Sequence, residues 1–442
     1  GGLMDTFLSM ARAETVEDLV TVFETVGGVP WNHTMATDTS GTLLYADTTL
    51  VPHLSDDGEA AFRALVESDQ PSFAQIAFSL GLVALDGSDP LFSVEVDESA
   101  TLAGAIPFSE APKLLGRRDF VANSNDSYWL SNPLEPLTGY SIRYGTTETP
   151  RSLRTRMGLT QILESESWDT RALQDLLFAN RSFTAELWQD GLAGACQQVS
   201  DVAASDGSTV DVAASCAAIT AWDGRFDLDS RGGMAFRETL GTVDRAGLFN
   251  GVSYFTVPFD PADAVATPRG LSTEGEAYLL TQMADATLRL AAVGIAPDDP
   301  LGQHQYTLRG DERFAIHGGQ QAADGIFNKT DYVFDPALNS SLLPQLERPP
   351  VVNSATDLTE EGYLINYGAS FILTVGFEDD GPVGQAILTY SQSDDPSSTH
   401  FSDQTALYSS KSWRPLPFTR AQIEADPMLT RIEVNDLEGA TD

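Results

Sequence analysis

The sequence predicts an α/β protein in which a helical region is inserted into a sheet-based core. The N-terminal part mixes strand-like and helical segments, the middle is dominated by amphipathic helical patterns, and the C-terminal part is dominated by strand patterns. This order fits an insertion of helices better than a regular alternation of strands and helices.

The N-terminal elements are predicted from local patterns. Thr15 and Asp18 have the spacing of a capping box, and apolar residues follow them at helical spacing. A strand is predicted over 41–47. Between 54 and 118, only a short helix over 60–66 is predicted among loops.

The later elements follow from hydrophobic periodicity. Helices are predicted from Thr170 onward, over 216–222 and over 276–290. A long strand is predicted over 370–377 and, after a turn, a returning strand over 385–390. The chain therefore ends in β structure.

The composition excludes two classes of partner. The net charge is -39 and only three of the 442 residues are lysine, so the surface repels phosphate backbones and we expect no nucleic-acid binding. No apolar run approaches the ~20 residues needed to cross a bilayer, so we expect no membrane span. The chain begins Gly-Gly-Leu-Met without a signal-peptide pattern, which we interpret as an internal or C-terminal part of a longer precursor.

The two cysteines, Cys196 and Cys216, flank a polar loop. No Cys-x-x-Cys or His–Cys cluster is present, which argues against a zinc site. Either the two thiols are buried separately or they form one disulfide. We favour the disulfide because both ends look helical and a covalent link would stabilise the polar loop between them most. A disulfide indicates an oxidising compartment.

The candidate site lies in the segment 119–133. This segment crowds Asn and Ser residues around a Tyr–Trp pair, directly after Phe120 and Val121, which we interpret as the end of a strand. Amide groups at a strand end suit hydrogen bonding to a carbonyl oxygen. The segment 149–156 follows with three arginines in a chain that has few cations. Together the two segments predict a site where amide donors and a guanidinium converge.

Several catalytic classes lack their motifs here. The sequence has no Gly-x-Ser-x-Gly elbow, phosphate-binding loop, dinucleotide fingerprint or His-Glu-x-x-His motif. The five histidines are scattered, and we interpret each as a surface or core residue. The paired aspartates lie in turn-like contexts, so we expect no metal and no cofactor.

Several long motifs, in order along the chain, resemble the penicillin acylase family of N-terminal-nucleophile hydrolases. The resemblance is greatest to its long-chain branch, the aculeacin and acyl-homoserine-lactone acylases, and covers nearly the whole chain. The segments that carry it are 29–31, 44–47, 120–129, 149–156, 222–224, 228–231, 316–319, 387–392 and 403–404.

The resemblance implies an N-terminal-nucleophile αββα four-layer core with an inserted helical region. Residues 1–150 would form part of that core, 151–325 a mainly helical region with the cysteine loop, and 326–442 a β-rich segment that completes the core. The family's β chain begins with a Ser whose hydroxyl is the nucleophile and whose α-amine is the base. This chain lacks that Ser, so we expect it to be the larger C-terminal part of a β subunit. Its partners would be the α chain and the N-terminal part of the β chain from the same precursor, and alone it would be inactive.

The resemblance also assigns site residues. It implies that Asn125 is the oxyanion-hole residue, for which the alternative is an Asx turn. It assigns Arg154 to the site arginine, although Arg151 and Arg156 leave the register open and pairing with Glu148 is an alternative.

Phe7 and Trp31 match positions that line the acyl pocket, for which ordinary core packing is the alternative. Cys196 and Cys216 match a cysteine pair of the long-chain branch, which supports the disulfide and a periplasmic or extracellular location.

The function that the resemblance implies is hydrolysis of an N-acyl amide. The expected substrate is an acyl-homoserine lactone or a lipopeptide that loses its fatty acyl chain. One alternative is a β-lactam or glutaryl-type acylase, which would prefer short or aromatic acyl groups. The other is a catalytically dead secreted binding protein with the same fold.

Overall fold

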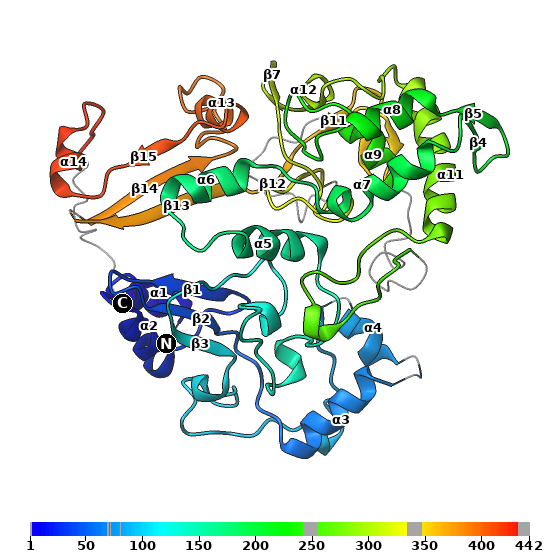
Figure 1. Cartoon of the computed structure of the whole chain (residues 1–442). Coiled ribbons are helices and arrows are strands. Elements are labelled where there is room, and N and C mark those ends of the chain that lie inside the picture. The colour runs from blue at the N-terminus through cyan, green and yellow to red at the C-terminus, as the bar shows by residue number, and fades with distance from the viewer. Residues whose placement is uncertain are drawn as a thin grey trace. The chain divides into compact units, whose positions relative to one another are not determined.

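The computed structural model describes residues 2–68, 70, 72–79, 81–241, 254–333, 347–379 and 381–431. The chain divides into two compact units, the first made of residues 1–164 and 243–278 and the second of residues 165–242 and 279–442. Both units contain helices and strands, as the predicted α/β class requires (Figure 1).

The first unit contains a three-stranded antiparallel sheet with β2 in the centre. Its strands are β1 (His33–Thr37), β2 (Leu43–Asp47) and β3 (Lys113–Arg117). Helix α2 (Val16–Thr25) covers this sheet, because Val16 and Phe23 are buried in one cluster with Leu44 and Ala46 of β2. The chain leaves this sheet at the end of β3 and continues into the loop that carries the candidate site.

The other elements of the first unit are short. They are α1 (Leu3–Met10), α3 (Asp56–Val66), α4 (Phe73–Ser79), α5 (Leu153–Leu163) and the 3-10 helices η1 (Pro90–Phe92), η2 (Phe108–Glu110), η3 (Tyr128–Leu130), η4 (Ile142–Tyr144) and η5 (Pro261–Asp263).

The predicted helix after Thr15, strand over 41–47 and helix over 60–66 were confirmed as α2, β2 and α3, but α4 lies in a stretch that was predicted as loop. Thr15 and Asp18 form the predicted capping box at the start of α2. The segment 113–117 was predicted as a loop, but it is the strand β3, which forms by pairing with β2. The segment has no strand pattern of its own. The interpretation of Phe120 and Val121 as a strand end was wrong, because β3 ends at Arg117 and a loop follows.

The second unit begins with helices. They are α6 (Thr170–Phe178), α7 (Phe183–Cys196), α8 (Ala213–Ala221), α9 (Gly233–Leu240), α11 (Thr273–Ala292, which starts in the first unit), α12 (Leu301–His304), α13 (Asp403–Ser409) and α14 (Arg420–Ala425). The predicted helices from Thr170 onward and over 216–222 and 276–290 correspond to α6 and α7, α8 and α11.

The strands of the second unit form small sheets. They are β4 (Asp201–Ala203), β5 (Thr209–Asp211), β6 (Gln305–Arg309), β7 (Glu312–Ala315), β8 (Thr330–Asp331), β9 (Val351–Asn353), β10 (Leu358–Thr359), β11 (Tyr363–Leu364), β12 (Tyr367–Gly368), β13 (Phe371–Glu378), β14 (Gly381–Leu388) and β15 (Arg414–Leu416). Among the described residues, every sheet has two or three strands. The four-layer arrangement stays a prediction.

The longest strands form the predicted C-terminal hairpin. β13 pairs antiparallel with β14, and β14 pairs with β15. Helix α6 lies beside β13 (Figure 1), and Gln174 Nε2 donates a hydrogen bond to Thr374 Oγ1 at 3.0 Å. The strand prediction for the C-terminal part missed α13 and α14.

A disulfide joins Cys196, at the end of α7, to Cys216 in α8, which confirms the predicted pair. The polar loop between them contains the hairpin of β4 and β5. Both sulfur atoms contact the buried Met283 of α11, so the disulfide lies in the core of the second unit.

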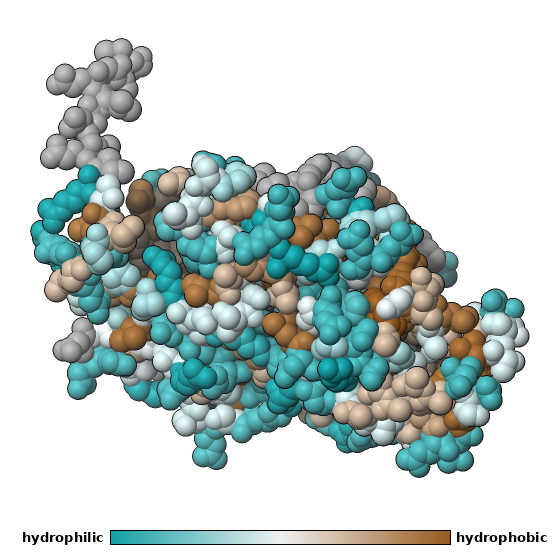
Figure 2. Space-filling view, turned by 90° about the horizontal axis from the view of Figure 1, so that it is seen from above, coloured by the Kyte–Doolittle hydropathy of each residue, from teal (hydrophilic) through white to brown (hydrophobic). Residues whose placement is uncertain are grey.

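Hydrophilic residues cover most of the face shown in Figure 2, with hydrophobic patches between them. This surface agrees with the large excess of acidic residues. In the part of the chain that the structure describes, no helix has both the length and the apolar character that crossing a membrane requires.

Candidate active site

The Asn-rich loop is held in one tight conformation. Asn123 Nδ2 donates to the carbonyl oxygen of Asp126 at 2.9 Å, and Asp126 N donates back to Asn123 Oδ1 at 3.3 Å. This pair of bonds closes the chain around Ser124 and Asn125. Ser127 then caps η3 by accepting a hydrogen bond from Trp129 N. The hydrogen bonds between Asn123 and Asp126 therefore fix the base of the loop, and Asn125 at its centre faces solvent.

Asn125 is that central residue. It is solvent-exposed and has a left-handed backbone with φ 57°, a conformation that Asn tolerates better than most residues. Its Oδ1 accepts a hydrogen bond from Arg154 Nη2 at 2.8 Å. Since a guanidinium can only donate, the oxygen must face Arg154 and the amide nitrogen must face away. Among the described residues, Asn125 Nδ2 has no hydrogen-bond partner, so its N–H groups are available to a ligand.

The three arginines of the segment 149–156 have different surroundings. Arg154, in the first turn of α5, contacts Asn125 and also donates to the carbonyl oxygen of Ser124. Arg151 is buried and forms an ion pair with Asp126 at 2.8 Å. Arg156 is buried and donates to backbone carbonyls, with burial lowering its pKa to about 10. The guanidinium that meets the candidate amide thus comes from Arg154.

Phe7 and Trp31 lie outside the core of the first unit. Phe7, in α1, is 46% exposed, and Trp31 is 76% exposed with φ 54°. Ordinary core packing therefore does not explain either aromatic ring.

The histidines do not form a site with Asn125. His33 Nδ1 is 2.6 Å from the hydroxyl of the buried Tyr45. His317 is fully buried in the second unit, where Nε2 donates to the carbonyl oxygen of Tyr408 at 2.9 Å, and desolvation lowers its pKa to about 4. His317 is a satisfied core residue, as predicted for scattered histidines. Within the residues described here, no group of three or more His, Cys, Asp or Glu side chains is placed to hold a metal ion.

A cavity of about 490 Å³ lies in the first unit beside α3 and α4. Phe78 and Tyr128 contribute aromatic walls, while Thr146 and Thr149 contribute hydroxyl groups. Neither Asn125 nor Arg154 lines this cavity. The available carboxamide is therefore not part of the cavity wall.

In this α/β protein, a guanidinium holds the oxygen of an exposed carboxamide. The carboxamide can therefore donate its N–H groups to a carbonyl oxygen or an oxyanion, as in enzymes that stabilise an oxyanion. The chain is a member of the penicillin amidase family, whose model matches residues 2–425. Its fold class is accordingly that of the N-terminal-nucleophile hydrolases, as the sequence motifs predicted. Members of this family are processed from one precursor into subunits.

Two relatives illustrate the similarity. The chain is 34% identical over 438 residues to the aculeacin-A acylase of Actinoplanes utahensis, with 96% of this chain and 50% of that protein covered. It is 31% identical over 441 residues to the acyl-homoserine lactone acylase PvdQ of Pseudomonas fluorescens, with 98% and 50% covered. The chain spans about half the length of the curated relatives it matches.

A solved structure is also similar. A thermostable penicillin G acylase from Alcaligenes faecalis matches with a TM-score of 0.49 and 14% identity, over 98% of this chain and 72% of that chain.

Reasoning from the sequence missed two residues of the loop. Asn123 and Asp126 are the groups that fix the conformation around Asn125. The sequence did contain a signal for Asp126, since it is an acidic residue in the loop and precedes the chain's most basic segment. Its contact with α5 is formed only by folding.

Proposed function

We propose that this chain is part of an N-acyl amide hydrolase that removes a fatty acyl chain. The observation that carries the proposal is the Asn125 carboxamide, whose oxygen is held by Arg154 and whose N–H groups are available. Family membership and the acylase names of the relatives support it. The substrate would be an acyl-homoserine lactone or a lipopeptide.

In the proposed reaction, the nucleophile is an N-terminal Ser on polypeptide outside this chain. Its α-amine, with an ordinary pKa of ~7.7–8.0, takes the hydroxyl proton at neutral pH. The Ser oxygen attacks the amide carbon, the C–N bond breaks, and the amine leaves with that proton. Water then attacks the resulting Ser ester and releases the fatty acid.

Asn125 would act in both halves of this sequence. Each attack turns the carbonyl oxygen into an oxyanion, and the Asn125 N–H would donate to it. Loss of one such donor lowers kcat about 10²–10³-fold in comparable sites. Arg154 would hold the carboxamide so that its nitrogen, not its oxygen, faces the reacting centre.

Phe7 and Trp31 would contact the acyl chain. Their exposure leaves both rings available to an apolar ligand. Each buried methylene contributes ~0.8 kcal/mol to binding, so an aromatic surface would favour long chains over short ones. Phe7→Ala should therefore raise KM for a dodecanoyl amide more than for a hexanoyl amide.

The complete protein would include an α chain and the N-terminal part of the β chain, cut from the same precursor. This chain alone would be inactive. The disulfide supports a periplasmic or extracellular location, where thiols are oxidised.

The decisive experiment is Asn125→Ala in the complete precursor, with deacylation of N-dodecanoyl-homoserine lactone measured per mature protein. We expect kcat to fall at least about 10²-fold with KM nearly unchanged. A near-normal rate would reject the role of Asn125. A panel of dodecanoyl, phenylacetyl and glutaryl amides distinguishes the β-lactam or glutaryl-type alternative. No turnover of any amide would favour the binding-protein alternative.

A further inference from the structure

The carboxylate of Asp126, next to the candidate site, accepts four hydrogen bonds. Its Oδ1 accepts hydrogen bonds from Arg151 Nη1 at 2.8 Å and Ser127 N at 2.9 Å. Its Oδ2 accepts from Ser152 N at 3.1 Å and Thr155 Oγ1 at 2.9 Å. Four donors thus converge on one side chain, and neither Asn125 nor Arg154 is among them.

These bonds connect the loop to α5 in a closed ring. Asp126 follows Asn125 in the chain, and Thr155 follows Arg154. The hydrogen bond between Asp126 and Thr155 and the one between Asn125 and Arg154 are therefore two parallel links between the same two segments. If the hydrogen bond between Asp126 and Thr155 breaks, the loop is no longer held at the distance from α5 that the bond between Asn125 and Arg154 requires.

Buried contacts of Arg151 stabilise the ring. The side chain of Arg151 is 3% exposed, and it packs over the ring of Trp129 at 5.2 Å. It also donates to the carbonyl oxygen of Thr149 at 3.0 Å. The carboxylate of Asp126, although outside α5, contacts the N-terminus of this helix, where the helix dipole further stabilises a negative charge. A displacement of the loop would separate this buried cation from its counter-charge, which is energetically costly.

We propose that Asp126 is a positioning residue for the reaction, which holds Asn125 and Arg154 in register by tying the loop to the start of α5. The inference rests on the proposed function. Asp126 itself touches no reacting atom. It keeps the Asn125 nitrogen where the oxyanion forms, and a small displacement weakens that hydrogen bond in the transition state more than in the ground state.

The test uses the complete mature enzyme, with rates normalised by titration of active sites. Asp126→Asn keeps the shape, but its NH₂ group must meet donors on one side and Arg151 loses its counter-charge. We expect kcat for N-dodecanoyl-homoserine lactone to fall 10–100-fold with KM within about twofold. Thr155→Val removes the bond to Asp126 and the contact with Ser152 Oγ but leaves the charge of Asp126 in place. It is the milder variant and should lower kcat three- to tenfold.

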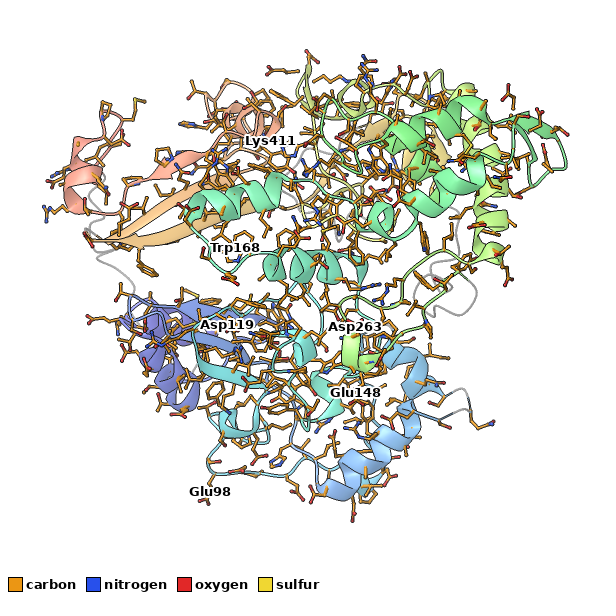
Figure 3. All side chains as sticks on the ribbon, viewed as in Figure 1. Glu98, Asp119, Glu148, Trp168, Asp263 and Lys411 are labelled. Carbon is orange, nitrogen blue, oxygen red and sulfur yellow. A yellow bond between two sulfur atoms is a disulfide. The ribbon has the colours of Figure 1, made fainter. Side chains whose placement is uncertain are left out.

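The matched control is Asp263→Asn. Asp263, labelled in Figure 3, is also an aspartate of the first unit that pairs with an arginine, Arg269, but both side chains are half exposed and it lies outside the loop that carries Asn125. Its variant should keep kcat within about twofold.

A double-mutant cycle with Asn125→Ala separates positioning from folding. If Asp126 acts through Asn125, then Asp126→Asn should cause no further loss of kcat in the Asn125→Ala background. Equal losses in both backgrounds, or a full kcat for both Asp126→Asn and Thr155→Val, would overturn the inference. Full activity of Asn125→Ala itself would instead reject the proposed function.

Discussion

Arg154 Nη2 lies 2.8 Å from Asn125 Oδ1, and this bond joins the first turn of α5 to the loop that follows β3. The bond determines which end of the carboxamide is available. A guanidinium offers several donors in a fixed plane, and Arg154 uses Nη2 on two successive residues of the loop, Ser124 and Asn125.

Arg154→Lys should therefore impair the reaction although it keeps the charge. An ammonium is a compact point charge and cannot hold both oxygens in the same geometry. We expect kcat to fall about 10–100-fold and KM to change little, measured by steady-state deacylation of a dodecanoyl amide. Arg118→Lys is the control, since Arg118 also donates to a loop carbonyl, that of Ser40. A normal kcat for Arg154→Lys would contradict this role.

Asn125→Asp should separate the donor from the shape of the residue. Asp has nearly the same volume and also tolerates the left-handed backbone, and its carboxylate would pair with Arg154. It offers no N–H group and repels an oxyanion. We expect thermal stability to stay the same or rise while kcat falls at least about 10²-fold. If the Asp variant kept its rate above pH 6, donation by this side chain could not be part of the reaction.

The sequence was sufficient where structure is local. The capping box of Thr15 and Asp18 forms as predicted because its bonds span three residues. Pairing between distant segments was not predictable in the same way. β3 depends on β2, and the ring around Asp126 depends on residues that are 26 and 29 positions away. The roles of Asn125 and Arg154 were assigned by family motifs, whereas the distance between them required the fold.

Removal of the disulfide should destabilise the second unit. A crosslink over a sequence separation of 20 restricts the unfolded chain and is worth about 3 kcal/mol. Cys196→Ala with Cys216→Ala should therefore lower the midpoint of thermal unfolding by roughly 6–12 °C. Calorimetry with and without reductant measures this. Reductant should lower the unfolding midpoint of the unmodified protein to that of the double variant, and it should leave the midpoint of the double variant unchanged. Equal midpoints for all samples would show that the crosslink adds no stability.

Burial of His317 should make the second unit sensitive to acid. Its pKa is lowered from 6.5 to about 4 chiefly by desolvation, so the folded state favours the neutral ring that donates to Tyr408 and lies beside Asn180. The unfolded chain binds a proton more readily. The stabilisation is therefore complete above about pH 6.5 and is lost as the pH falls from there to about 4, a total of about 3 kcal/mol.

His317→Gln keeps one donor and one acceptor but does not titrate. In urea unfolding, the free energy of unfolding of the variant should therefore fall by about 3 kcal/mol less between pH 7 and pH 4 than that of the unmodified protein. His400→Gln, a change at a side chain that is 59% exposed, is the control and should keep the full acid sensitivity. The same acid sensitivity in all three proteins would mean that protonation of His317 does not contribute to it.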